Sequence, residues 1–345
     1  MKTHTKKLLL LSTFISILLL VLSCSTNDKS SILAEQQIET VSRIVLIEPS
    51  KSPSFRYITG LNISSIQPKW SPDKNLFAFI SKEDNLNNLW ISDKDGIYFK
   101  VTNNNQMEVE SFEWSPNSKE IAIEYESVEK SSNIFLYTLE NENLLPITRS
   151  NKIARLGSWS PDNKWITYTI DNSIYISNPK GVNEIYISEG QNPKWSPNGE
   201  YIIFTRTENK IANLWIYKDV DKVIKEVGKD KDKASKDNEF IEKIHKNANL
   251  NIIEFIWAYG GNKILYISDI ENNNEIYIHE IKNGNNKRLT NNEVDEKNIS
   301  WSEKNRSILF TSDAHGRADI YKMKGNGSDQ IIILNSNENF NYLDW

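Results

Sequence analysis

Short runs rich in β-branched and aromatic residues recur along most of the chain. One set of runs reads LFAFI, EIAIEY, WITYTI, YIIFTR, KILYIS and SILFTS, and a second set reads NLWIS, NIFLY, SIYIS, NLWIY, EIYIH and DIYKM. Their apolar period is two rather than 3.6, which predicts strands and not helices. Polar segments rich in Asn, Asp, Gly and Pro separate the runs, as is typical of turns. The pattern therefore predicts an all-β fold built from many short strands.

A tryptophan marks the end of a short strand at regular intervals. It stands in PKWSPDK from Pro68, EWSPNSK from Glu113, SWSPDNK from Ser158 and PKWSPNG from Pro193. The aligned series is Trp70, Trp114, Trp159, Trp195, Trp257, Trp301 and Trp345. Successive members are 44, 45, 36, 62, 44 and 44 residues apart. A period near 44 matches the roughly 40–45 residues of a four-stranded propeller blade.

The Trp series is expected to fill the space between blades. Inner strands of packed blades are buried on both faces, and Trp is the largest apolar side chain available to fill the gap. A row of aromatic residues that stacks bases or sugars is the alternative, but repeated placement at strand ends suits packing better. We therefore expect these seven positions to be structural.

The two ends of the chain are expected to share one blade. Residues 340–345, FNYLDW, read as a first strand with nothing after it, and residues 43–59 resemble the second half of a repeat. Pairing them would remove a free sheet edge and join the termini. Six full repeats and one shared blade predict seven blades, with six as the alternative. The predicted domain is a single propeller over residues 43–345.

A charged insertion lengthens the fourth interval, over about residues 219–251. Its KEVGKDKDKASKDNEFIEKIHK stretch alternates charge signs and has few large apolar residues, which favours a solvated loop or a short exposed helix. Val220, Val223, Ile224 and Val227 have helical spacing, so an arm that binds a partner stays open as the other hypothesis.

Composition and charge narrow the function. The chain has 345 residues, of which 38% are hydrophobic and 25% charged, and a formal net charge of −5. These values are typical of a globular body with a polar surface. No block of basic residues dominates, so the sequence gives no support to nucleic-acid binding.

The N-terminus predicts export and a lipid anchor. Lys2, Lys6 and Lys7 precede an uncharged apolar run, somewhat short for a membrane span, so residues 1–23 are expected to be a signal peptide. The run ends in VLSC, which resembles the lipobox of bacterial lipoproteins and implies a lipid on Cys24, the only Cys. A plain cleaved signal is the alternative. Residues 24–42 are then expected to form the lipidated Cys and a flexible tether. Removal of residues 1–23 leaves a formal charge of −8, which does not favour anionic headgroups.

The repeat resembles that of TolB-type propellers, also called PD40 or WD40-like. The shared elements are WSPD or WSPN, an aliphatic-aromatic strand, IY or LW, and a closing Leu-Thr, and they cover nearly all of residues 43–345. The resemblance fixes a class of repeat but no single function. A bare lipoprotein propeller is also similar in architecture to BamB-type lipoproteins of the outer-membrane assembly (BAM) complex, which is an analogy of fold alone. No functional residue of either family matches by motif.

Candidate chemistry is sparse. No Gly-x-Ser-x-Gly elbow, phosphate-binding Gly-rich loop or His/Cys cluster is present, so we expect no catalytic residue, no metal and no cofactor. His279 and His315 are expected at the surface. Asp93-Lys94-Asp95-Gly96 lacks the later ligands of a calcium loop and predicts a hairpin turn.

The sequence thus favours a non-enzymatic scaffold, lipid-anchored in a bacterial envelope, most simply at the outer membrane facing the periplasm. We expect a monomeric propeller that binds an envelope protein through one rim, where mixed charge suits a protein partner. The rim positions expected at the starts of first strands are Glu108, Glu110, Arg155, Gln191, Glu254 and Lys297. The rival is a small-ligand or glycan site in the funnel, with Trp90 and Trp215 as platforms. A hidden enzyme is a third hypothesis.

Overall fold

The computed structural model describes residues 31–48, 54–83, 85–102, 107–127, 129–227, 240–245, 250–335 and 338–345. The predicted signal peptide, Cys24 and the first part of the predicted tether lie outside the described residues. So do residues 228–239 and 246–249 of the predicted insertion. Within the ranges described, no helix is both long and apolar enough to span a bilayer.

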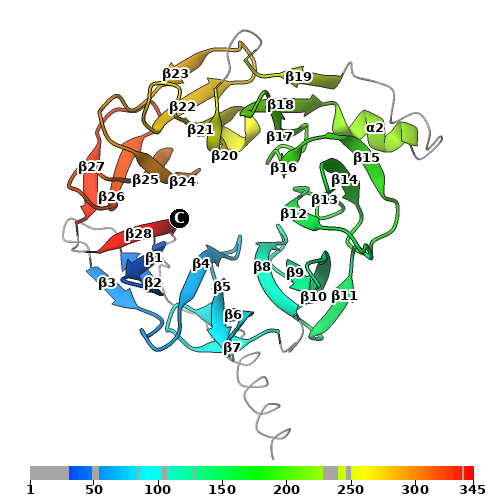
Figure 1. Cartoon of the computed structure of the whole chain (residues 1–345), viewed down its shortest axis with the longest axis horizontal. Helices are drawn as coiled ribbons and strands as arrows, with labels where there is room; N and C mark the ends of the chain where they lie inside the picture. The colour runs from blue at the N-terminus through cyan, green and yellow to red at the C-terminus, as the bar shows by residue number, and fades with distance from the viewer. Residues whose placement is uncertain are drawn as a thin grey trace, which may run out of the picture.

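Seven four-stranded antiparallel sheets stand as blades around one axis (Figure 1). This confirms the all-β propeller and its seven blades. Blade 1 contains β4 (Ser65–Trp70), β5 (Leu76–Glu83), β6 (Leu86–Asp93) and β7 (Tyr98–Lys100). Blade 2 contains β8 (Met107–Trp114), β9 (Glu120–Ser127), β10 (Ser132–Thr138) and β11 (Asn143–Pro146). Blade 3 contains β12 (Ala154–Trp159), β13 (Ile166–Ile170), β14 (Ser173–Ser177) and β15 (Ile185–Glu189).

The remaining blades follow the same order of strands from the axis outward. Blade 4 contains β16 (Gln191–Trp195), β17 (Tyr201–Glu208), β18 (Ile211–Lys218) and β19 (Ile241–Lys243). Blade 5 contains β20 (Ile252–Ala258), β21 (Lys263–Ser268), β22 (Glu275–Glu280) and β23 (Asn286–Arg288), with a 3₁₀ turn, η2 (Tyr259–Gly261), after β20. Blade 6 contains β24 (Glu296–Ser302), β25 (Ser307–Ser312), β26 (Asp319–Lys324) and β27 (Ile331–Leu334). Blade 7 contains β28 (Asn339–Asp344), β1 (Ile32–Ile38), β2 (Val41–Glu48) and β3 (Ser54–Tyr57).

Blade 7 joins the two ends of the chain, as predicted, but it begins earlier than predicted. The C-terminal strand β28 pairs with β1, which pairs with β2. Residues 32–38 were expected to belong to the tether, and they form the second strand of the blade instead. Ile32, Leu33 and Ala34 are fully buried. The propeller therefore starts at Ile32 and not at residue 43, because this strand is stabilised by pairing with residues some 300 positions away.

The hydrophobic core is divided into seven clusters, one at each junction between neighbouring blades. Five members of the Trp series are nearly fully buried: Trp70, Trp114, Trp159, Trp195 and Trp345. Trp257 and Trp301 are half-buried. The Trp side chains thus pack where blades meet, and the closed ring depends on seven separate apolar interfaces.

The Ser-Pro-Asx phrase after each of four Trp residues closes a tight turn. In blade 1 the hydroxyl of Ser71 donates to Asp73 Oδ1 at 2.6 Å and accepts from the backbone N–H of Leu76 at 3.0 Å. The same two bonds recur around Ser115, Ser160 and Ser196. The fourth residue after each of these four Trp residues has φ between 60° and 78°. Asn163 and Gly199 tolerate this left-handed conformation readily, and Lys74 and Ser118 adopt it in the other two turns.

The threonine after the fourth strand ties that strand to the third. Its Oγ1 accepts a backbone N–H near the start of the third strand at 2.9 Å in four blades. The pairs are Thr59 with Ile44, Thr102 with Leu89, Thr148 with Ile134 and Thr290 with Ile276. The repeated Leu/Ile-Thr pair therefore has a structural role, because the hydroxyl replaces a ladder hydrogen bond where the edge strand ends.

A helix forms within the predicted insertion. Residues with helical spacing make up α2 (Val220–Val227), and Val220 and Val223 are buried against Phe240 and the core of blades 3 and 4. The helix is thus packed and not simply exposed. The insertion was also expected to contain only loop or helix, but its later part contains β19, the outer strand of blade 4.

The two faces of the disc differ in what they display. First and third strands begin at one face, which we call the rim face, and end at the other, which we call the Trp face because the Trp-Ser-Pro turns lie there. The first strands β4, β8, β12, β16, β20, β24 and β28 surround the axis (Figure 1). Any central site is therefore built from these seven strands.

Candidate functional site at the channel and the rim

The residue before each Trp lies on an inner strand, and several of these residues contact a neighbouring blade. These residues are Lys69, Glu113, Ser158, Lys194, Ile256, Ser300 and Asp344. Lys69 Nζ donates to the Phe112 carbonyl oxygen at 3.1 Å and lies 2.5 Å from Glu113 Oε1. Asp344 Oδ2 accepts the Trp70 N–H at 2.7 Å, and Ser158 Oγ accepts the Trp195 N–H at 2.7 Å. Polar side chains near the axis therefore connect neighbouring blades by hydrogen bonds and an ion pair.

The charges near the axis compensate one another. Burial lowers the pKa of Lys69, but Glu113 and other acidic neighbours outweigh burial and hold that pKa above its usual value. Burial lowers the pKa of Lys194, whose Nζ donates to the Phe255 carbonyl oxygen at 2.8 Å. Burial raises the pKa of Tyr342, because the phenolate is the charged form. The inner strands thus present a closed set of paired groups and not a field of one sign.

The pairing of each inner strand with the second strand of its blade contains a register shift. Backbone N–H groups near these shifts donate hydrogen bonds to carboxylates of neighbouring blades. Glu35 accepts from Gln67 N at 3.1 Å and Glu124 from Leu156 N at 2.8 Å, in each case across a blade junction. Glu254, a predicted rim residue, does the same with Ile299 N at 3.1 Å. Burial raises the pKa of Glu254. Its carboxylate is thus engaged inside the propeller.

Three other predicted rim residues come together where blades 2 and 3 meet. Glu108 and Glu110 lie on β8 and Arg155 on β12, all half-buried or more exposed. Arg155 Nη1 lies 2.6 Å from Glu124 Oε1. Burial raises the pKa of Glu110, and the carboxylates of Glu126 and Glu124 raise it further. This part of the rim is an acidic cluster that a single arginine partly neutralises.

The last two predicted rim residues stand apart from this cluster. Gln191 begins β16 and is exposed. Lys297 lies on β24, with its Nζ 2.8 Å from Asp313 Oδ2. The six predicted positions are thus spread over five blades, and only the blade 2 and 3 group forms a local cluster.

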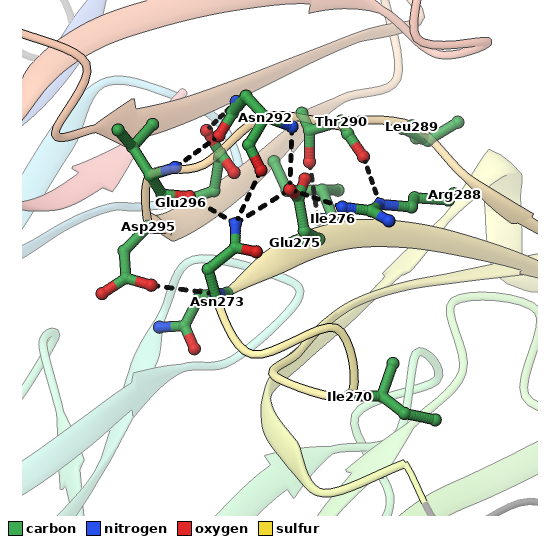
Figure 2. Close-up of polar contacts among 12 residues, drawn as sticks. Ile270, Asn273, Glu275, Ile276, Arg288, Leu289, Thr290, Asn292, Asp295 and Glu296 are labelled. Carbon is green, nitrogen blue, oxygen red and sulfur yellow. Dashed lines mark hydrogen bonds and ion pairs between the residues drawn. The ribbon is translucent and has the colours of Figure 1, made fainter.

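A pair of fully buried glutamates joins blades 5 and 6 beneath the rim face (Figure 2). Glu275 begins β22 and Glu296 begins β24. Glu275 Oε1 accepts from Arg288 Nη2 at 2.7 Å, Asn273 Nδ2 at 2.9 Å and Asn292 N at 3.0 Å. Burial raises the pKa of Glu275, but these hydrogen bonds and one from Thr290 outweigh burial and hold the pKa below its usual value.

Glu296 is the member of this pair whose pKa is raised. Its Oε1 accepts from Asn292 Nδ2 at 2.9 Å and Ser312 Oγ at 3.0 Å. Burial and the neighbouring Glu275 raise the pKa of Glu296 to about 7. The Oε2 atoms of both glutamates have no hydrogen-bond partner. The two side chains are fully buried, which makes this pair a structural link and not a catalytic dyad.

One histidine prediction was wrong. His279 is 5% exposed, with its ring centroid 5.0 Å from that of His245, because blade 4 and the end of the insertion cover it. Burial lowers the pKa of His279 to about 4. His315 is half-exposed and pairs with Asp319 at 2.9 Å. Among the described residues, no group of three or more His, Cys, Asp or Glu could hold a metal ion.

The aromatic platforms proposed for a funnel ligand lie away from the axis. Trp90 and Trp215 are on third strands. Trp90 packs against Tyr98 of the outermost strand, at 5.8 Å between ring centroids, and Trp215 lies under the guanidinium of Arg206 at 4.6 Å. They pack within the blades, as third-strand residues are expected to do, and do not line a funnel.

The sequence did not predict the role of the residues before each Trp, because the residue type at this position varies. The position before Trp holds Lys, Glu, Ser, Ile or Asp, so no motif marks it. The useful signal is positional: the residue one before each aligned Trp occupies the same place in every blade.

Comparison with known proteins agrees with this geometry. TolB from Acinetobacter baumannii matches with a TM-score of 0.58 and 14% identity, over 91% of this chain and 66% of that chain. An oligogalacturonate lyase from Vibrio parahaemolyticus matches with a TM-score of 0.67 and 14% identity, over 87% and 88%. The β-propeller domain of the Trilobed protease from Pyrococcus furiosus matches with a TM-score of 0.62 and 13% identity, over 89% and 99%. These likenesses establish the fold, and the three proteins differ in function.

The sequence itself carries the family relationship. No curated protein sequence matches the chain. The family described as TolB beta propeller domain (PD40) matches residues 53–238, which is more than half of the chain. Together with the seven blades and their Trp-Ser-Pro turns, this match establishes that the chain belongs to the TolB beta propeller domain family.

Proposed function

We propose that this protein is a membrane-tethered, non-enzymatic scaffold that binds a protein partner at its rim face. The setting we propose is the bacterial envelope, with a lipid on Cys24 and a role in envelope maintenance or outer-membrane protein assembly. TolB from A. baumannii supports this by likeness of fold and family alone. Exposed residues of this chain supply the remaining support.

The observation that carries the proposal is a set of exposed apolar residues on the rim face. Ile253 is 52% exposed at the start of the inner strand β20, and Ile270 is 45% exposed in the loop before β22. Leu61, Ile63 and Ile153, in loops that lead into first strands, are 41–44% exposed. Apolar residues surrounded by charged side chains of both signs are typical of protein interfaces.

The interactions of side chains near the axis favour the rim face as the place where a partner binds. Lys69, Lys194 and Glu254 have their partners inside the ring. A partner that approached the axis would have to break these interactions, whereas the apolar rim residues are open. A glycan or small ligand in the funnel is the weaker alternative, since Trp90 and Trp215 are packed within blades.

Crosslinking in the native envelope tests the proposal. Wild-type protein and a double variant, Ile153→Glu with Ile270→Glu, are purified after mild crosslinking and the co-purified proteins are compared. We expect one protein to accompany the wild type and to be lost from the double variant. Lys287→Glu on the Trp face is the matched control, and it should keep the partner. If the same amount of partner is recovered with the wild type, the double variant and Lys287→Glu, binding at the rim face is contradicted.

The anchor has its own test. Cys24→Ala should remain unprocessed or be released from the membrane fraction. If Cys24→Ala is still correctly processed and membrane-bound, the lipid assignment is wrong.

A further inference from the structure

The Trp face also carries exposed apolar residues, and they occur on five consecutive blades. They are Ile331 in blade 6, Phe55 in blade 7, Ile97 in blade 1, Leu145 in blade 2 and Val182 in blade 3. We call these five residues the apolar arc. They are between 45% and 58% exposed. All lie in the loop before the fourth strand or in the fourth strand itself, on the outer edge of the disc.

The arc is interrupted where the neighbouring blades are polar. The second residue of the fourth strand is Phe55 in blade 7 and Ile332 in blade 6, both exposed. The same strand position is Glu242 in blade 4 and Lys287 in blade 5. Five consecutive blades therefore share a feature that the fourth strands of blades 4 and 5, as the structure describes them, lack. This distinguishes the arc from single exposed apolar residues scattered over a surface.

The described chain begins in blade 7, which is one of the five blades of the arc. Strand β1 starts at Ile32 on the Trp face of blade 7, and the hydroxyl of Ser31 donates to the carboxylate of Glu48 at 2.7 Å there. Cys24 is seven residues before Ser31. Even fully extended, that stretch spans at most about 25 Å. A lipid on Cys24 would therefore hold blade 7, and the Trp face with it, close to the membrane.

We propose that the apolar arc is a second membrane contact, which rests on a lipid surface and turns the rim face away from it. This inference rests on the lipid anchor of the proposed function. It assigns the partner of the Trp face as the interfacial region of a bilayer. The rim face is then left free for a protein partner.

Charge does not explain such a contact, and apolar burial does. The loops and strand ends beside the arc hold Arg56, Lys94, Lys180 and Lys324 together with Glu48, Asp93, Asp95, Glu140, Glu142, Glu184 and Asp329. Acidic residues outnumber basic ones, so anionic headgroups would not attract this edge. Apolar and aromatic side chains that enter the headgroup boundary can add to the membrane affinity that the lipid anchor supplies.

The test uses the full acylated protein in phosphatidylcholine vesicles. Acylation blocks Cys24, the only Cys, so one introduced Cys is the only free thiol. Ile97→Cys and Leu145→Cys report on the arc. Lys287→Cys is the matched control on the same face outside the arc, and Ile153→Cys is the control on the rim face. Each is labelled with the environment-sensitive fluorophore NBD, in vesicles with and without brominated lipid as a quencher.

We expect a blue shift and quenching at positions 97 and 145, and neither at positions 287 and 153. A second measurement uses Ile97→Glu with Leu145→Glu, checked by thermal unfolding to be folded. This double variant should bind vesicles at least about tenfold more weakly than the wild type, since each side chain loses most of its burial in lipid. Raising NaCl from about 0.1 M to about 1 M, which shortens the Debye length from about 10 Å to about 3 Å, should leave wild-type binding unchanged.

Two results would overturn the inference in distinguishable ways. If the protein binds vesicles but positions 97 and 145 are no more quenched than position 287, the arc does not touch lipid while the anchor stands. If the protein stays in solution and Cys24 reacts with maleimide, the anchor and the arc fail together. A protein partner or a second copy on the arc would give the first of these results.

Discussion

The indole Nε1 of Trp114 donates a hydrogen bond to the backbone carbonyl oxygen of Lys69 at 3.1 Å, across the junction of blades 1 and 2. Trp159 bonds the Glu113 carbonyl oxygen in the same way, and Trp257 bonds the Lys194 carbonyl oxygen. The repeated Trp is thus both an apolar filler and a polar link to the residue before the preceding Trp. The double role applies to these three positions, whereas the indole N–H groups of Trp70, Trp301 and Trp345 have no hydrogen-bond partner.

Trp114→Phe should destabilise the propeller more than Trp70→Phe. Both replacements remove similar apolar volume from a buried site, but the indole N–H of Trp70 has no hydrogen-bond partner. Loss of the Trp114 bond leaves the Lys69 carbonyl oxygen unpaired, which should cost about 1–2 kcal/mol beyond the packing loss. Urea unfolding of the two variants measures the difference, and equal losses would show that the bond contributes nothing.

Ser71→Ala should destabilise blade 1 by about 1–3 kcal/mol. The Ser71 hydroxyl is buried and holds both Asp73 and the Leu76 N–H, and its removal leaves both without that partner. Ser302→Ala is the matched control, because Ser302 stands in the same place after Trp301, lacks the following Pro, and only accepts from Asn305 N at 3.3 Å. Thermal unfolding should rank Ser302→Ala well above Ser71→Ala in stability. The reverse order would contradict the role given to the turn.

Glu296→Gln should change how stability depends on pH. The folded-state pKa of Glu296, about 7, lies above its ordinary value, so its contribution is fully present below the ordinary pKa and is lost as pH rises through 7. Gln mimics the protonated carboxyl and removes that loss. The free energy of unfolding of Glu296→Gln minus that of the wild type should rise with pH, by up to about 1.4 kcal/mol per pH unit, between about 4.5 and 7. A flat difference would mean that the folded-state pKa of Glu296 is not raised.

His279→Gln should act in the opposite sense. The folded-state pKa of His279 is lowered to about 4, so its contribution is present above the ordinary pKa of 6.5 and is lost as pH falls toward 4. The variant should therefore lose less stability on acidification than the wild type does. The window overlaps that of Glu296, so the two effects partly cancel in the wild type, and each variant has to be compared with it separately. If the free energy of unfolding falls equally for the variant and the wild type from pH 6.5 to 4, His279 does not cause the loss of stability in acid.

The Trp period was sufficient to predict seven blades and a blade shared by both ends, because it records contacts that every blade repeats. Strand β1 was missed because its sequence, ILAEQQI, ends in polar residues. The structure buries Glu35 and Gln36 by pairing them with Ser42 and Arg43. The pairing of β1 with the C-terminal strand β28 is a long-range contact, which local pattern cannot reveal.

The candidate site was less predictable than the fold. Glu254 was expected on a partner-facing rim, yet it accepts an N–H that a strand irregularity in the next blade sets free. The apolar residues of the rim face and of the arc have no repeat signal, because each belongs to a loop or edge that differs between blades. Features that repeat report the architecture here, and features that do not repeat carry the candidate function.

Site-specific photocrosslinking in whole cells tests the central claim most directly. p-Benzoylphenylalanine is placed at Ile253 on the rim face or, as the control, at Glu142, which is exposed on the Trp face. The account predicts one discrete protein adduct from position 253 that is lost when Ile270→Glu is added, and none from position 142. No adduct from position 253, or the same adduct from both positions, would contradict a rim face that binds a protein partner.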